Sequence, residues 1–130
     1  MAKRKPKIGR RLMVYMPWPP SINDYYGNRR GGGRYLLPHA RAFRRSVGWL
    51  VSVASDGWGH LPITGPVRVQ LQAFPPDRRR YDLDNREKAV FDALEAAGII
   101  KDDSQVVEKA AKKMEPVTGG AYLVIVEELL

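Results

Sequence analysis

Apolar and polar residues alternate along Val67–Ala73, and this period of two predicts a half-buried strand that ends at Phe74-Pro75-Pro76. Three further segments share a strand-like composition and are bounded by proline or glycine. They are Leu12–Met16, Gln105–Met114 and Ala121–Glu127. Thr118-Gly119-Gly120 separates the last two and predicts a hairpin turn between them.

Two segments repeat their apolar residues at helical spacing. The first is predicted to start near Pro38 and to end at Ser55, before Asp56-Gly57. Its apolar stripe comprises Phe43, Val47, Leu50, Val51 and Ala54. The second is predicted to start at Asp84, with Glu87 completing a capping box, and to end at Gly98. Its stripe comprises Val90, Phe91, Leu94 and Ala97.

The elements therefore follow the order β-α-β-α-β-β. The chain has 130 residues, the length of one ordinary domain. We predict a single α+β domain, residues 12–130, with a mixed four-stranded sheet and two main helices. The preceding residues 1–11 carry six basic and no acidic side chains and are interpreted as a basic N-terminal arm, which either contacts phosphates or is functionally neutral.

Charge indicates the class of partner. Twenty-two lysines and arginines against fourteen aspartates and glutamates give a formal net charge of +8, which favours binding to polyanions such as nucleic acid. No cysteine is present, so a metal would be held by oxygen or imidazole ligands, and carboxylates favour Mg²⁺ or Mn²⁺. No apolar run approaches the length of a membrane span, and we expect a soluble, cytoplasmic protein.

Two basic segments are candidates for contact with DNA. Arg29, Arg30 and Arg34 flank the glycines of Gly31–Gly33 beside two tyrosines, which predicts a flexible cationic loop. The second segment, Arg78-Arg79-Arg80-Tyr81, leads directly into the most acidic part of the chain. A plain mobile loop is the alternative interpretation of the first segment.

Asp82 and Asp84 lie two residues apart, and in an extended segment their side chains share one face. Two adjacent carboxylates repel each other unless a cation neutralises them, which favours a metal site. The alternative is that Asp84 caps the helix while Asp82 pairs with an arginine. Lys88 lies one helical turn beyond Asp84, where it either contacts a phosphate or pairs on the helix surface. We expect Asp92 to pair with Lys88.

Asp102 and Asp103 follow the second helix, and one of them reaches the first two aspartates if this turn packs near the strand end. Otherwise they are solvated turn residues. A carboxylate-bound Mg²⁺ would supply what phosphodiester hydrolysis requires: charge neutralisation on the phosphate, an activated water and a stabilised leaving oxygen.

Several blocks together resemble the RusA family of Holliday junction resolvases of bacteria and phages. They are Pro17-Trp18-Pro19-Pro20-Ser21 with Asn23 and Tyr25-Tyr26, Pro76–Arg80, Asp82-Leu83-Asp84-Asn85 with Lys88, Phe91–Leu94 with Gly98, and Asp102-Asp103 before Gln105-Val106-Val107. Order and spacing agree from about Leu12 to Glu127.

The resemblance implies a homodimeric, Mg²⁺-dependent endonuclease that nicks four-way DNA junctions symmetrically in recombination and repair. It makes Asp82, Asp84 and Asp103 the metal ligands and Lys88 the essential basic residue, with Asp102 a neighbour of lower rank. Tyr81 departs from the arginine that relatives often carry there; it either stacks on an unpaired base or covers the site. Two alternative functions are a nuclease that prefers flaps or forks and a non-catalytic DNA-binding module.

Overall fold

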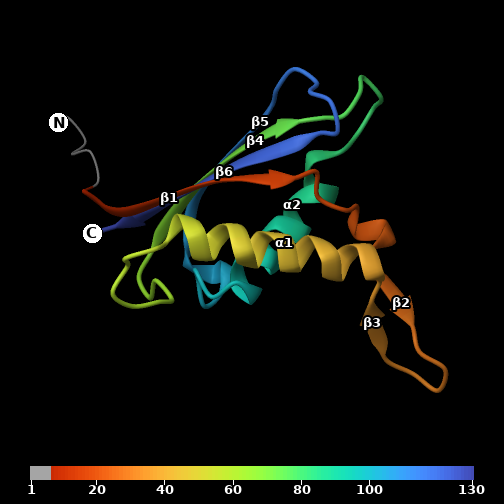
Figure 1. Ribbon diagram of the computed structural model, residues 1–130, viewed down its shortest axis with the longest axis horizontal. Coiled ribbons are helices and arrows are strands. Elements are labelled where there is room, and N and C mark those ends of the chain that lie inside the picture. Colours follow the sequence, from red (N-terminus) through yellow and green to blue (C-terminus); the bar gives the residue numbers. More distant parts are fainter. Residues whose placement is uncertain (1–6) are drawn as a thin grey trace.

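A computed structural model describes residues 7–130, and its elements follow the predicted order with additions near the N-terminus (Figure 1). The strands are β1 (Ile8–Pro17), β2 (Tyr26–Asn28), β3 (Arg34–Leu36), β4 (Val67–Phe74), β5 (Val106–Lys113) and β6 (Ala121–Leu129). The helices are α1 (Pro38–Ala54) and α2 (Leu83–Ala96), with short 3-10 helices at Ile22–Asp24 and Asp103–Gln105. The α+β prediction is confirmed.

The main sheet has four strands in the order β1-β6-β4-β5. β6 is antiparallel to both of its neighbours, whereas β4 and β5 are parallel. A parallel pair needs a crossover connection, and α2 provides it. The predicted mixed sheet is therefore present, but the predicted hairpin between the last two strands is wrong, because β4 lies between β5 and β6. Because β4 and β5 are parallel, the chain that follows β4 lies beside the chain that follows β5.

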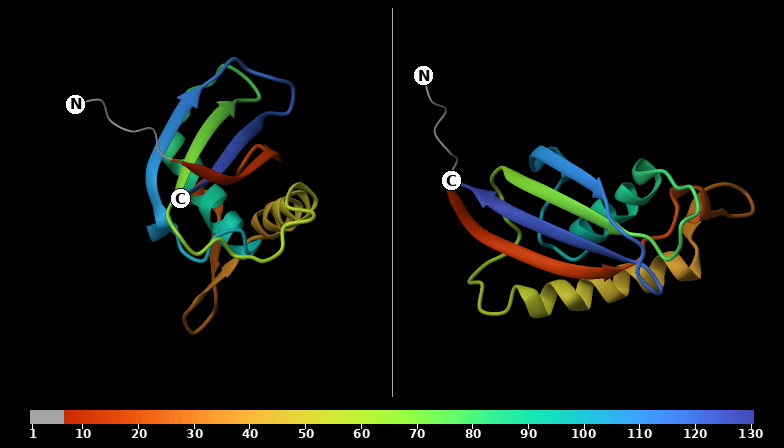
Figure 2. Two further views of the ribbon diagram at one scale, coloured as in Figure 1. Left: turned by 90° about the vertical axis from the view of Figure 1, so that its left-hand side faces the viewer. Right: turned by 90° about the horizontal axis from the view of Figure 1, so that it is seen from above.

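The core lies between one face of this sheet and both helices (Figure 2). In β4 the predicted alternation holds, with Val67, Val69, Leu71 and Ala73 buried. The helices contribute stripes of buried side chains to the same cluster: Ala40, Phe43, Val47 and Val51 from α1, and Ala89, Val90, Ala93 and Leu94 from α2. Ala54, predicted in the first stripe, is exposed. The opposite sheet face carries no helix among residues 7–130.

The first strand begins earlier than predicted. Residues 8–11, which the sequence assigned to the basic arm, continue β1, and Arg10 pairs with Glu128 of β6 at 3.0 Å. Hydrogen bonds from Arg10 lower the pKa of the Glu128 carboxyl, so this pair stabilises the folded state at neutral pH. Residues 1–6 of the predicted arm lie outside the described residues. No helix within residues 7–130 is long and apolar enough to cross a membrane.

The predicted cationic loop is a short β-hairpin. β2 and β3 pair antiparallel and project away from the body of the molecule (Figure 1). Arg29 and Arg34 stand on either side of its tip, where Gly31, Gly32 and Gly33 all adopt positive φ. Arg34 also lies 4.3 Å from the ring centre of Tyr26. The hairpin therefore presents its arginines on a defined extension of the fold.

Candidate active site

Asp82 occupies the position before the first turn of α2. Its backbone is extended (φ −105°, ψ 123°), and its Oδ1 accepts a hydrogen bond from the Asp84 amide at 3.1 Å. Such a cap satisfies one of the free amides at a helix start, where negative charge is also favoured. The predicted cap at Asp84 with Glu87 is wrong: the helix begins one residue earlier, and Asp82 is the cap.

Asp84 therefore lies inside the first helical turn. The prediction that Asp82 and Asp84 share one face of an extended segment is wrong, because only Asp82 is extended. Both side chains remain exposed at the N-terminus of α2. Neither forms an ion pair within residues 7–130.

A surface cavity of about 370 Å³ brings together residues from α2, the turn after it and β5. It is lined by Asp84, Glu87, Lys88, Phe91, Asp92, Asp103 and Lys109. Three of the four residues predicted to be catalytic therefore line one cavity. The fourth, Asp82, is not among the lining residues. Its carboxylate accepts a hydrogen bond from the amide of Asp84, which does line the cavity.

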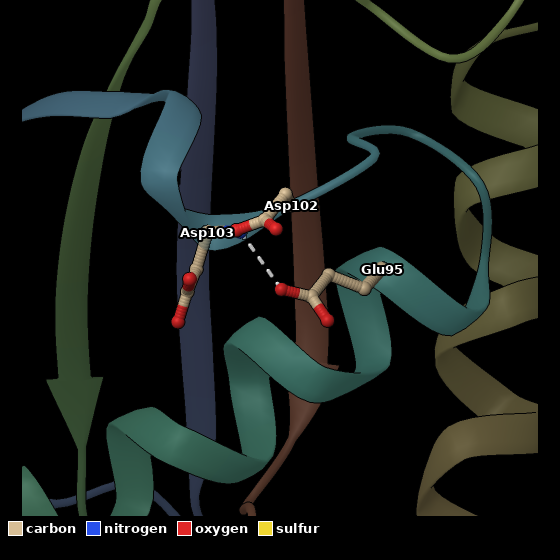
Figure 3. A group of neighbouring side chains, drawn as sticks. All are labelled: Glu95, Asp102 and Asp103. Atoms are coloured by element: carbon tan, nitrogen blue, oxygen red, sulfur yellow. Dashed lines mark hydrogen bonds between the residues drawn. The ribbon is translucent and has the colours of Figure 1, made fainter.

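Asp103 also belongs to a compact acidic cluster with Glu95 and Asp102 (Figure 3). Ligand oxygens of the three carboxylates lie within 4.8 Å of one another. Hydrogen bonds to backbone amides account for part of this proximity. Glu95 accepts from the Asp103 amide at 2.8 Å, and Asp102 accepts from the Ser104 amide at 2.8 Å.

Asp102 has a structural role of its own. With Gln105 it forms a capping box around the short helix Asp103–Gln105, and the hydrogen bonds from Ser104 hold the pKa of its carboxyl below the usual range. Gln105 in turn donates to the carbonyl oxygens of Ile63 and Gly65 at 2.6 and 2.9 Å. These bonds fix the turn that carries Asp103.

Lys88, the lysine of the predicted site, lines the cavity and pairs with no acidic residue of the described chain. The predicted pair between Lys88 and Asp92 is wrong: Asp92 lies 3.8 Å from Arg44 of α1. Arg44 is distant in sequence, and the packing of α1 on α2 brings it there. Within residues 7–130 Lys88 forms no ion pair, so its ammonium group is available to a ligand of the cavity.

Sequence analysis missed a second lysine of the cavity. Lys109 of β5 donates a 2.8 Å hydrogen bond to Glu87, a carboxylate only 6% exposed. This bond, and the nearby Glu87 and Asp84 charges, raise the pKa of Lys109 and keep it cationic. The pattern that could have revealed it is the spacing of Lys109 and Lys113, which places both on one face of β5.

The Arg78-Arg79-Arg80 segment lies on the loop between β4 and α2, with two of its cations in exposed ion pairs. Arg78 is 3.0 Å from Glu115, and Arg79 is 3.4 Å from Asp77. Such exposed pairs are weak and exchange readily for phosphate contacts. This loop and the end of β5 together line a cavity of about 280 Å³.

Tyr81 points inward. Its ring packs edge-on against Trp18 at 5.2 Å between centroids, and Trp18 also contacts Tyr122 at 5.4 Å. Burial raises the pKa of Tyr81. The Tyr81 side chain is therefore part of an aromatic cluster that ties the Pro17–Pro20 segment to the start of α2.

Carboxylates and lysines around one cavity, on a strongly basic domain, are typical of a nuclease. Comparison with known families defines the class of protein. A sequence model described as endodeoxyribonuclease RusA matches residues 17–125. The chain belongs to the RusA family of endodeoxyribonucleases.

Its relatives come from bacteria and a phage. The chain is 42% identical over 110 residues, 85% of this chain and 88% of the relative, to the crossover junction endodeoxyribonuclease RusA of Escherichia coli strain K12. It is 41% identical over 110 residues, with the same shares, to that of Enterobacteria phage 82. A third relative, from Escherichia coli O139:H28, is 37% identical over 116 residues, 89% of this chain and 93% of the relative.

Proposed function

We propose that this protein is a Mg²⁺-dependent endonuclease that resolves four-way DNA junctions by symmetric paired nicks, in recombination and repair. The observation that carries the proposal is the cavity shared by Asp84, Lys88 and Asp103. The names of the relatives, crossover junction endodeoxyribonucleases, support a four-way DNA junction as the substrate. Because those relatives are bacterial and phage proteins, we place the activity in the bacterial cytoplasm.

The chemistry of the assigned residues fits a divalent cation, although among residues 7–130 the three carboxylates that lie within 4.8 Å of one another are those of Glu95, Asp102 and Asp103. Asp84 and Asp103 supply hard carboxylate oxygens from two elements, are exposed, and form no ion pair within residues 7–130. Mg²⁺ needs only a few protein oxygens, because it keeps several waters. We assign Asp84, Asp103 and Asp82 as its ligands, with Mn²⁺ as a substitute. When bound, the ion would neutralise phosphate charge and lower the pKa of an attacking water.

Lys88 and Lys109 add positive charge to the same cavity. In the proposed reaction Lys88 binds a non-bridging oxygen of the scissile phosphate and stabilises the charge that develops there. Lys109 is held by Glu87, so part of its charge is already compensated. Lys88 therefore remains the free cation of the pair among the described residues.

The exposed arginines would hold the DNA backbone on either side of the cut. Arg29, Arg30 and Arg34 sit on the projecting hairpin, and Arg78, Arg79 and Arg80 on the loop that leads to Asp82. Tyr81, whose ring is packed inside, would support this loop and touch DNA only at its margin. Contacts of this kind position a duplex and recognise junction shape without reading sequence.

We also propose that the active form is a homodimer. A four-way junction is close to two-fold symmetric, and two identical subunits present two sites in matching positions. We place the contact on the sheet face opposite the helices, where Met13 and Tyr15 of β1 are 48% and 63% exposed among the described residues. They lie beside Ile125 and Leu123 of β6 in the register of the sheet.

Tyr15→Glu tests this interface. A charge in the centre of an apolar contact is costly to bury, so we expect sedimentation to show a dimer for the parent and a monomer for the variant at micromolar concentration. The variant should still bind duplex DNA, because its arginines are intact. A parent protein that is monomeric at every concentration would contradict the dimer, and an unaffected Tyr15→Glu dimer would place the interface elsewhere.

The substrate is tested by incubating the protein with an end-labelled four-way junction, a flap and a linear duplex, each with Mg²⁺ or with EDTA. We expect Mg²⁺-dependent nicks at symmetric positions in opposing strands of the junction, and little cleavage of the linear duplex. Faster cleavage of the flap than of the junction would shift the assignment to branched DNA of that type. Absence of cleavage by well-folded protein would contradict the proposal.

A further inference from the structure

One basic side chain contacts the backbone next to Asp82. Lys113 is the last residue of β5, and its Nζ donates a 2.9 Å hydrogen bond to the carbonyl oxygen of Tyr81. That carbonyl belongs to the peptide that joins Tyr81 to Asp82. The same ammonium group lies 4.5 Å from the centre of the Tyr81 ring. Lys113 therefore holds the residue before Asp82 at both its backbone and its side chain.

The topology of the sheet explains this contact. Because β4 and β5 are parallel, their C-terminal ends lie side by side, and Lys113 is opposite Ala73 in the register. Two more hydrogen bonds join the chain segments beyond these strand ends. The Met114 amide donates to the carbonyl oxygen of Ala73 at 2.7 Å, and the Val117 amide donates to that of Pro75 at 2.9 Å. Lys113 thus projects from a fixed strand end onto the loop that leaves β4.

This loop has few other strong attachments. Its three consecutive arginines repel one another, and the ion pair of Arg78 with Glu115 joins side chains that are 79% and 83% exposed. Near its end, the Tyr81 ring packs against Trp18, and the bond from Lys113 holds the Tyr81 carbonyl as well. Lys113 forms no ion pair within residues 7–130.

We propose that Lys113 is a positioning residue for DNA cleavage, which holds the Tyr81–Asp82 peptide and so orients the Asp82 carboxylate at the start of α2. The proposal rests on the proposed metal-dependent nuclease function, and it adds a residue that acts through Asp82 rather than on the DNA. Small displacements of catalytic groups are costly, with about 1 Å sufficient for a hundredfold loss of rate.

The test compares Lys113→Met with Lys112→Met. Both remove one exposed lysine from β5, but Lys112 lies opposite Gln72 on the other face of the sheet. Three quantities are measured: the single-turnover cleavage rate at saturating protein, the junction Kd in metal-free buffer, and the Mg²⁺ concentration that gives half-maximal rate. Thermal melting by circular dichroism checks the fold of each variant.

We expect Lys113→Met to lower the saturated rate by about tenfold or more and to raise the Mg²⁺ midpoint, while its Kd stays within about twofold of that of Lys112→Met. Lys113→Arg should recover much of the rate, because a guanidinium group can still donate to the Tyr81 carbonyl. If Lys113→Met instead weakens Kd and leaves the saturated rate unchanged, Lys113 is a phosphate contact and the proposal is overturned.

The parent protein and Asp103→Asn are assayed beside these variants. Cleavage by the parent, its loss in Asp103→Asn and an unchanged rate in Lys113→Met would overturn the positioning role alone. A parent protein that does not cleave the junction would overturn the proposed function, and the positioning role with it.

Discussion

Asp103→Asn is expected to reduce junction cleavage by at least about a hundredfold. Asn keeps the size of the side chain but removes the negative charge that a divalent cation requires. In metal-free buffer the same variant should bind the junction as well as the parent, or more tightly, because a carboxylate near the phosphate backbone has been neutralised. Single-turnover cleavage and junction Kd measure the two effects separately.

Asp102→Asn is the matched control for this substitution. It removes the same charge from the adjacent residue, and Asn remains a good cap for the short helix Asp103–Gln105. Asp102 does not line the cavity that holds Asp84 and Lys88. We therefore expect the cleavage rate of Asp102→Asn to stay close to that of the parent protein. If Asp103→Asn binds the junction much more weakly than the parent in metal-free buffer, the placement of the site is contradicted.

Lys88→Ala is expected to lower the single-turnover rate by about a hundredfold, and to change junction Kd by only a few fold. The reason is that Lys88 lines the cavity without an ion-pair partner in residues 7–130, so in the proposed reaction its charge acts on the phosphate rather than on protein stability. Lys112 is an exposed lysine on the outer sheet face, so Lys112→Ala is the control for the loss of one positive charge.

The opposite pattern would assign Lys88 a different role. If Lys88→Ala weakens junction binding and flattens its salt dependence, but the rate at saturation is unchanged, the residue attracts the DNA backbone only. The assignment of Lys88 to the scissile phosphate would then be wrong, although the metal ligands would be unaffected.

The sequence predicted the order and kind of the main elements because their patterns are local. The alternation in β4 and the helical spacing of Phe43, Val47 and Val51 are visible without tertiary information. The hairpin of β2 and β3 was missed, since each strand has only three residues and their periodicity is too short to recognise.

The site was predicted less completely, because several of its contacts cross the fold. Asp92 pairs with Arg44 through the packing of two helices, and Lys109 of β5 reaches Glu87 of α2, the helix that connects β4 to β5. Neither partner is a sequence neighbour. The helical position of Asp84 depended on where α2 begins, and helix boundaries are the least certain part of a sequence pattern.

Two arrangements of carboxylates share Asp103. In one, Asp103 lines the same cavity as Asp84 and Lys88; in the other, Asp103 joins Glu95 and Asp102 in the cluster of the turn. Backbone hydrogen bonds account for Glu95 and Asp102 in the second arrangement. For this reason we assign the metal to the first.

The position of the bound ion tests the account most directly. Crystals grown with Mn²⁺ and measured at its absorption edge would locate the ion by anomalous scattering. We predict a peak in the cavity, within coordination distance of about 2.1–2.3 Å of oxygens from Asp84 and Asp103. A peak held by Glu95 and Asp102 with no contact to Asp84, at full occupancy, would contradict the proposed active site.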